Sequence, residues 1–351
     1  MLQYKYNDKG ASDMDYREEI SKTKIFKQEY LDGLNRLILD RQLEMAEKRK
    51  EYGKNIFEDQ EAYREDFKKM LGWPLVDYES KGIPSVKCEK LSDGSGYSVY
   101  RMRFEILDGV TVTGLYFQVD GDGKKPLVLV QHGGNGTPEL ISGVYGGTSN
   151  YNLMLERVIA HGVNAFAPQL LLWDESYGVP FDRVNIDARL KRVGSSITAV
   201  ELYGLTRILD YFEAHDNVSS FGMVGLSYGG FYTLFLSALD KRIRSAVSCS
   251  FFSTRDEYPW SDWTWFRSAE KLDDAEIACL VYPRKLCIEI GTKDALFDVK
   301  HGMDAFETLT ELCKDVGTEW LTFIPFDGTH EFCHNDEPIT EMVKHLLADT
   351  N

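Results

Sequence analysis

The stretch that decides the fold is FGMVGLSYGG, residues 221–230. Its first residues are apolar and indicate a buried strand, and the apolar run Phe231–Leu239 after it indicates a helix. Between them stands Gly225-x-Ser227-x-Gly229, the pattern of a serine on a sharp strand-to-helix turn. Glycine at the two flanking positions leaves the room that such a turn requires. We therefore expect Ser227 to stand above a sheet, at the N-terminus of a helix, as a candidate nucleophile.

Around this turn, predicted strands alternate with predicted helices. Tyr97–Ile106 and Val110–Val119 alternate in hydrophobicity around Asp108-Gly109, a pair typical of hairpin turns. The following strands are predicted over Leu127–Gln131, Val163–Ala167, Gly222–Gly225, Ile243–Ser248, Leu286–Ile290 and Trp320–Phe323. The helices between them are predicted over Tyr151–Ala160, Ile186–Ala214, Phe231–Asp240, Gly302–Lys314 and Ile339–Leu347. Such an order predicts an α/β fold, with a mostly parallel central sheet flanked by helices.

Residues 1–80 have a different composition and predict a helical N-terminal extension, followed by a catalytic domain over 81–351. Residues 18–70 are rich in Glu, Lys, Arg, Leu and Tyr, and their apolar side chains recur near helical spacing. A second helix is predicted over Glu61–Leu71, before Gly72 and Pro74. The extension either packs on the rest of the chain, or covers the active site, or joins two copies of the chain as a homo-oligomer.

The overall charge limits the classes of partner. Among 351 residues, 56 Asp and Glu outnumber 40 Lys and Arg, which gives a formal net charge of −16. So acidic a chain argues against nucleic acid or an anionic membrane surface as a partner. Neither a signal peptide nor an apolar run long enough to span a membrane stands out in the sequence. We therefore expect a cytoplasmic protein that acts on a neutral or cationic small molecule.

The cysteines and histidines give little indication of a metal site. The six cysteines are spread along the chain and form no C-x-x-C pair. The run His330-x-x-Cys333-His334 has no second group of ligands at a matching spacing. We expect neither a metal ion nor a cofactor.

A serine nucleophile needs a base and a carboxylate that orients the base. In a strand–turn–helix context of this kind, the expected chain order is serine, acid, histidine. Asp294 follows the strand Leu286–Ile290, and His330 follows the strand Trp320–Phe323, so both stand at the carboxyl edge of the predicted sheet. Asp298 and His334 are the alternatives for the two roles. Because the base must be neutral, we expect activity to fall below about pH 6–6.5.

A second glycine-rich turn follows the strand Leu127–Gln131. The sequence QHGGNG, residues 131–136, offers backbone N–H groups with little side-chain obstruction. We expect the N–H groups of Gly134 and Tyr228 to form an oxyanion hole. Asn135 is a candidate pocket residue, and His132 is interpreted as a brace of the loop rather than as a base.

An aromatic-rich segment, residues 253–283, separates two predicted core strands. It contains Trp260, Trp263 and Trp265, and each such ring buries a large apolar area wherever it packs. The segment either fills the core or forms a cap over the substrate pocket. Trp173, in the loop after the strand Val163–Ala167, is a weaker candidate for the same pocket.

Taken together, these motifs resemble the α/β-hydrolase superfamily, and more narrowly its dienelactone hydrolase and acetyl xylan esterase-like branch, whose members include chains with a helical N-terminal extension. The matching segments are residues 132–134, 225–230, 238–243, 282–286, 291–294 and 328–330. The resemblance implies the α/β-hydrolase fold and cofactor-free hydrolysis of carboxylic esters. It implies Ser227 as nucleophile, Asp294 as acid and His330 as base.

The chain also departs from two subfamilies. Dienelactone hydrolases proper use a cysteine where this chain has Ser227, and glucuronoyl esterases carry a basic residue where it has Tyr228. A peptidase or an acyltransferase using the same three residues, and a catalytically silent scaffold, remain as alternative functions.

Overall fold

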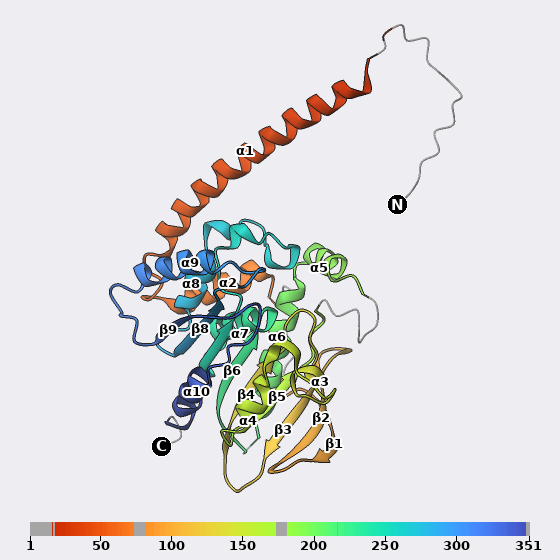
Figure 1. Cartoon of the computed structure of the whole chain (residues 1–351), viewed down its shortest axis with the longest axis vertical. Coiled ribbons are helices and arrows are strands. Elements are labelled where there is room, and N and C mark those ends of the chain that lie inside the picture. The colour runs from red at the N-terminus through yellow and green to blue at the C-terminus, as the bar shows by residue number, and fades with distance from the viewer. Residues whose placement is uncertain (1–15, 17, 74–81, 173–180, 216, 349–351) are drawn as a thin grey trace, which may run out of the picture.

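A computed structural model describes residues 16, 18–73, 82–172, 181–215 and 217–348 of the chain (Figure 1). Within these residues, nine strands form one sheet in the order β1-β2-β3-β5-β4-β6-β7-β8-β9. The strands are β1 Val86–Asp93, β2 Tyr97–Leu107, β3 Val110–Val119, β4 Lys125–Gln131, β5 Asn164–Pro168, β6 Val218–Leu226, β7 Ile243–Cys249, β8 Lys285–Gly291 and β9 Leu321–Phe326. The helices are α1 Ile20–Gly53, α2 Gln60–Leu71, α3 Pro138–Ile141, α4 Met154–Ile159, α5 Arg183–Arg192, α6 Ile197–Glu213, α7 Tyr228–Leu239, α8 Asp274–Cys279, α9 Val299–Leu312 and α10 Glu337–Ala348.

The strand directions divide the sheet into two parts. β1, β2, β3 and β5 pair with one another antiparallel, whereas β5, β4, β6, β7, β8 and β9 pair parallel in that order. The predicted hairpin is confirmed as β2 and β3, which are joined at Gly109 with φ +73°. The mostly parallel sheet is also confirmed. Strand β1 was not predicted, because its residues are mostly exposed and carry little apolar pattern.

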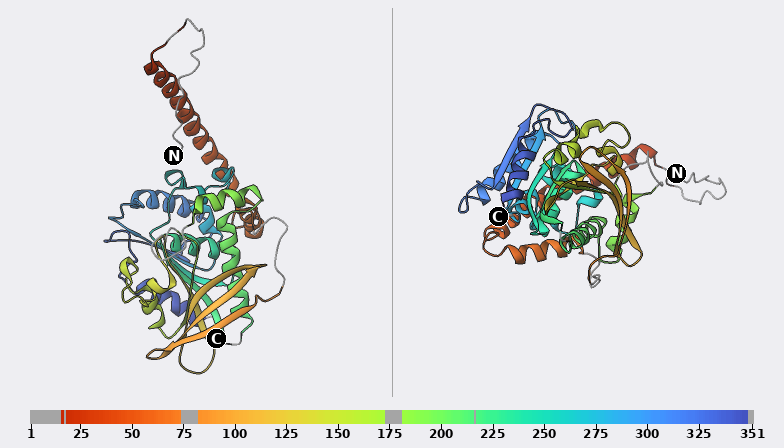
Figure 2. Two further views of the ribbon diagram at one scale, coloured as in Figure 1. Left: turned by 90° about the vertical axis from the view of Figure 1, so that its right-hand side faces the viewer. Right: turned by 90° about the horizontal axis from the view of Figure 1, so that it is seen from below.

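The parallel strands are buried on both faces, which explains their nearly continuous apolar sequences. In β4, Leu127 and Leu129 belong to one buried cluster, and Val128 and Val130 belong to the other. The first cluster also takes side chains from α2, α6, α7, α8 and α9, and the second takes them from α3, α4 and α10. The helices therefore cover both faces of the sheet (Figures 1 and 2).

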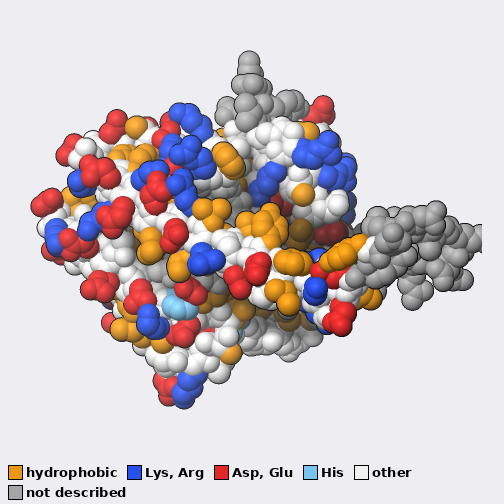
Figure 3. Space-filling model, turned by 90° about the horizontal axis from the view of Figure 1, so that it is seen from above, with side chains coloured by type: hydrophobic (Ala, Val, Ile, Leu, Met, Phe, Trp, Pro, Cys, Tyr) orange, Lys and Arg blue, Asp and Glu red, His pale blue; other side chains and the backbone are white. Residues whose placement is uncertain are grey.

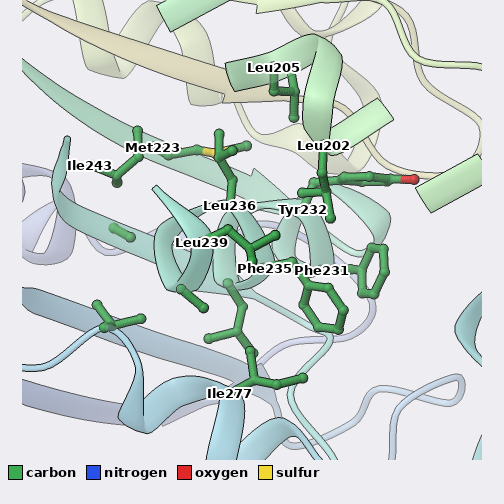
Figure 4. Packing of buried hydrophobic residues seen from close by; sticks show 14 of the residues in the cluster. Leu202, Leu205, Met223, Phe231, Tyr232, Phe235, Leu236, Leu239, Ile243 and Ile277 are labelled. Carbon is green, nitrogen blue, oxygen red and sulfur yellow. The ribbon is translucent and has the colours of Figure 1, made fainter. Parts of the chain in front are cut away.

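Helix α7 lies in the middle of the first cluster, and all 12 of its residues are buried. Figure 4 shows its side chains between Met223 of β6 on one side and Ile277 of α8 on the other. A helix that is apolar all round is stable only inside such a core. This burial fixes the N-terminus of α7, and with it the residue just before the helix.

The two N-terminal helices differ in how they meet this core. Asp59 caps α2 by accepting a hydrogen bond from the N–H of Ala62 at 3.2 Å, and Gly72 ends the helix with φ +77°. Arg64 of α2 is buried and donates to the carbonyl oxygens of Ala238 and Leu280 at 2.9 and 2.7 Å. Helix α1, by contrast, projects away from the sheet over most of its length (Figures 1 and 2).

Candidate active site

Ser227 stands between the end of β6 and the first residue of α7, with φ +61° and ψ −121°. A side chain at Gly225 would place its Cβ 2.4 Å from the backbone of Gly229, and one at Gly229 would come within 2.2 Å of the carbonyl oxygen of Gln131. The N–H of Ser227 donates to the carbonyl of Cys249 on β7 at 2.8 Å. Two glycines and one strand hydrogen bond thus hold the serine at a backbone angle that L residues rarely adopt.

Asp294 and His330 are brought together by the neighbouring strands β8 and β9. The Nδ1 atom of His330 lies 2.8 Å from Oδ2 of Asp294, whose side chain is fully buried. The other oxygen, Oδ1, accepts hydrogen bonds from the N–H groups of Leu296 and Phe297 at 2.8 and 3.0 Å. Burial raises the pKa of Asp294, but the hydrogen bonds from His330 and these backbone groups outweigh it and leave the pKa below its usual value.

Ser227 and His330 line one cavity of about 580 Å³. The other residues that line it are Gly133, Gly134, Asn135, Leu140, Ser149, Asn150, Tyr151, Val184, Leu226, Tyr228, Trp260, Ser261, Asp262 and Leu296. The cavity therefore brings together the candidate nucleophile, the candidate base, both expected oxyanion residues and two of the expected pocket residues. Asp294 lies behind His330, where a residue that orients the imidazole is needed.

Comparisons with known proteins concern the fold. No family model matches the sequence, and no curated protein matches it either. A proposed acetyl xylan esterase from Bacteroides fragilis superposes with a TM-score of 0.63 at 16% identity, over 84% of this chain and 83% of that one. A glucuronoyl esterase from Solibacter usitatus gives 0.59 at 13% identity, over 84% and 93%. A cold-adapted esterase from an Arctic intertidal metagenomic library gives 0.53 at 22% identity, over 76% and 100%.

The chain has the α/β-hydrolase fold. The strand order, the serine turn after β6 and the likeness to these solved structures all support this statement. The expectation drawn from the sequence motifs is thereby confirmed for the fold. At 13–22% identity this likeness establishes the fold and not an activity.

The glycine-rich loop after β4 is braced from two sides. The N–H of Gly133 donates to the hydroxyl of Tyr151 at 2.8 Å. The buried His132 accepts at Nε2 from the N–H of Leu170 at 3.1 Å, while its Nδ1 lies 2.9 Å from the carbonyl of Gly133. His132 thus stands in the bracing position that the sequence suggested. The brace by Tyr151 was not predicted, and no local signal near residue 151 points to it.

The sequence analysis also missed a buried ion network behind Tyr228. Arg183 of α5 is 1% exposed and bridges Glu201 at 3.0 Å and Asp262 at 2.8 Å. The Tyr228 hydroxyl donates to the same Asp262 oxygen at 3.0 Å, and the Arg183 guanidinium lies over the Tyr228 ring. Burial acts to lower the pKa of Arg183, but the carboxylates of Glu201 and Asp262 contribute to raising it well above its usual value. The network fixes the side chain that follows the nucleophile.

The loop that carries His330 is held by two asparagines near the 3₁₀ turn Ser149–Tyr151. Asn150 donates from its side chain to the carbonyl of His330 at 2.9 Å, and its own carbonyl accepts from the N–H of Phe332 at 2.8 Å. The Asn152 side chain donates to the carbonyl of Phe332 at 2.6 Å. These contacts join segments about 180 residues apart in the sequence, so periodicity could not have revealed them.

The aromatic residues that the sequence predicted for the pocket occupy different places in the structure. Trp260 lines the cavity, but Trp263 and Trp265 do not and instead belong to the buried core. Trp263 stacks on Phe231 of α7 with ring centroids 5.2 Å apart, because the apolar side of that helix is open to the 253–283 segment. The prediction of a pocket role for these two tryptophans is corrected accordingly. Trp173 lies outside the described residues.

Within the described ranges, no group of three or more His, Cys, Asp or Glu side chains is arranged to hold a metal ion. In the same ranges, none of the helices combines the length and the apolar content that crossing a bilayer demands.

Proposed function

We propose that this chain is a serine esterase that cleaves carboxylic esters through an acyl-enzyme. The observation that carries the proposal is the Asp294–His330 hydrogen bond, together with a serine at the start of a helix that lines the same cavity as His330. The three side chains are the ones that acyl transfer by a serine requires. The solved structures with this fold that were compared above include proteins described as esterases, which agrees with the proposal.

In the proposed reaction, Oγ of Ser227 attacks the ester carbonyl carbon, and its proton passes to Nε2 of His330. The negative oxygen of the tetrahedral intermediate is stabilised by the N–H groups of Gly134 and Tyr228. The intermediate then expels the alcohol, which takes the proton from His330. Water then attacks the acyl-enzyme in the same way, with His330 again as the base, and the acid is released. The ionised Asp294 keeps the imidazole in the tautomer that can accept a proton at Nε2.

The lining of the cavity favours a neutral or cationic ester over an anionic one. Among the described residues that line it, no Lys or Arg occurs, and Asp262 brings a carboxylate. Apolar walls come from Leu140, Val184 and Leu296, and the ring of Trp260 adds a flat surface. Such a site suits an uncharged alcohol or sugar carrying a short acyl group. The carboxylate of Asp262 is already paired with Arg183, so an anionic substrate would meet no free cationic side chain among the described residues that line the cavity.

The test replaces the nucleophile. Ser227→Ala should reduce the hydrolysis of 4-nitrophenyl acetate to the background rate and abolish labelling by a fluorophosphonate probe. Ser237→Ala, a matched change of a buried serine on α7 away from the cavity, should leave both unchanged. Retention of most of the rate in Ser227→Ala would refute the proposal.

The alternative functions are tested on the same protein. A silent scaffold would not react with the fluorophosphonate probe at all. An acyltransferase would deliver the acyl group to an added alcohol in preference to water, and a peptidase would cleave amide substrates at rates similar to esters.

A further inference from the structure

Helix α1 carries an exposed apolar face that nothing in the described chain covers. The side chains of residues 20–41 are exposed, and the first side-chain hydrogen bond from α1 to the described catalytic part comes at Gln42, which donates to Asp256 at 3.1 Å. Further along, Arg49 donates to the carbonyl of Ala269 and pairs with the carboxylates of Asp273 and Glu276. The preceding six turns of helix project from the molecule (Figures 1 and 2).

Six of the large exposed side chains of this projecting part share one face, and we call them the α1 stripe; Ile25 and Leu39, both 57% exposed, lie on the other side of the helix. The stripe consists of Phe26, Tyr30, Leu31, Leu34, Leu37 and Ile38. Steps of three and four residues place them within one side of a helix. Their exposed fractions run from 38% for Leu34 to 71% for Tyr30. Figure 3 shows a row of apolar side chains along the projecting helix.

An isolated helix of this length gains little stability from its own hydrogen bonds. In proteins, most helical stability comes from packing an apolar face against something else. Burying one large apolar side chain contributes about 1.5–3 kcal/mol. The α1 stripe therefore favours a partner that presents a matching apolar surface of the same length.

We propose that this partner is a second copy of the chain, with the two α1 helices lying antiparallel along their stripes. Residues 20–44 make a helix about 37 Å long. With roughly a third of its circumference covered, each helix would bury about 500 Å², or about 1,000 Å² in total, which is near the lower limit for a specific interface. The dimer should accordingly be reversible and depend on protein concentration.

The charges next to the stripe select the antiparallel orientation. Lys27 lies one turn before Leu31 on the stripe face, and Arg41 lies three residues after Ile38 on the same face. In a parallel pair, each of these cations would face the same cation of the second copy, and the two like charges would repel. In an antiparallel pair centred near Arg36, Lys27 would instead lie beside Glu44 of the partner subunit, twice by symmetry. Within its own helix, Glu44 pairs with Lys48 at 2.8 Å and with Arg41, and it remains 44% exposed.

Sedimentation equilibrium of the full chain tests the interface. Between about 1 and 200 µM, we expect the wild type to pass from monomer to dimer, because interfaces at the lower end of the size range are typical of weak, transient complexes. Leu34→Glu should keep the chain monomeric throughout that range. Leu43→Glu is the matched control, because Leu43 is also exposed but lies on the opposite side of α1. This variant should dimerise like the wild type.

A charge exchange tests the orientation. Lys27→Glu should weaken dimerisation at least tenfold, because two glutamates would then meet at each end of the interface. The double variant Lys27→Glu with Glu44→Lys should restore it. Circular dichroism reports whether each variant is folded, independently of whether the proposed function is correct.

Three results would overturn the inference. The first is a wild-type chain that stays monomeric at all concentrations. The second is a dimer that Leu43→Glu disrupts as much as Leu34→Glu does. The third is a monomeric wild type that binds lipid vesicles through the stripe, with Leu34→Glu abolishing the binding, because the occupant would then be a membrane surface.

Discussion

Ser227 keeps a backbone angle of φ +61° because every neighbouring group is arranged around it. The glycines on either side remove the Cβ atoms that would clash, and the hydrogen bond to Cys249 ties the turn to the next strand. Strain of this kind costs on the order of 1–3 kcal/mol and persists only where the surroundings impose it. At this scale the site is a small set of residues, each held by contacts that are already formed before a substrate arrives.

Asp294 offers a prediction with a definite pH dependence. Its pKa lies below the usual value, so the carboxylate is ionised throughout the range in which an esterase would work. Asp294→Asn should lower kcat for 4-nitrophenyl acetate by about 10⁴-fold, because an amide favours the wrong histidine tautomer. Wild-type activity should fall toward acidic pH, because a general base must be neutral to accept the proton of the serine.

Stability follows from the same pKa shift. A carboxyl group with a lower pKa in the folded chain stabilises it above the unfolded value of about 3.9, and the contribution is lost as the pH falls through the folded pKa. The difference in unfolding free energy between wild type and Asp294→Asn should therefore be largest near neutral pH and shrink below about pH 4. Urea unfolding at several pH values measures it, and a difference that is independent of pH would contradict the assignment.

At the scale of elements, the site depends on which segments meet. Strands β8 and β9 are parallel neighbours, so the loops after them place Asp294 and His330 side by side. The 253–283 segment contributes Asp262, which joins α5 to the first residue of α7 through Arg183 and Tyr228. This buried network is expected to fix the shape of one wall of the cavity.

Arg183→Met tests the network. It would leave the carboxylates of Glu201 and Asp262 buried without their cation, and breaking such a pair costs about 3–5 kcal/mol. Arg267→Met is the control, because Arg267 pairs with Glu270 at the surface and should contribute less than about 1 kcal/mol. Urea unfolding at pH 7 compares the two. Equal effects would show that the Arg183 network does not stabilise the fold.

At the scale of the whole molecule, the two N-terminal helices have separate roles. Phe67 of α2 is fully buried and packs against Phe235 of α7 with ring centroids 5.0 Å apart, so α2 is part of the core. Residues of α1 such as Leu31, which is 50% exposed, lie outside it. One helix completes the fold of a single chain, and the other is available to a second copy.

Substitutions in the two helices should therefore differ in effect. Phe67→Ala should destabilise the chain by about 3–5 kcal/mol, because it leaves a cavity in the core. Leu31→Ala should change the unfolding free energy of the monomer by less than about 0.5 kcal/mol. Both are measured by denaturant unfolding at about 1 µM, where the proposed dimer is dissociated. A large loss in Leu31→Ala at that concentration would show that α1 packs on its own chain.

The features that local sequence predicted share one physical origin. The turn at Ser227, the β2–β3 hairpin and helix α2 each depend on residues within a few positions of one another, through glycine geometry, alternation or helical spacing. Ser227, Asp294 and His330 each follow a predicted strand, and the carboxyl ends of parallel strands meet at one edge of a sheet. The sequence therefore predicted that the three residues lie at the same edge. In the structure, Asp294 and His330 form a hydrogen bond, and Ser227 shares the cavity with His330.

Tertiary structure alone decided the contacts that join distant segments. The ion pair of Arg183 with Asp262 spans 79 residues, and the choice of Trp260 over Trp263 as a cavity wall depends on the apolar side of α7 that Trp263 covers. A sequence pattern states that a side chain will be buried, but it does not state against what. Burial is a property of the surface that closes over a residue, and that surface exists only once the chain has folded.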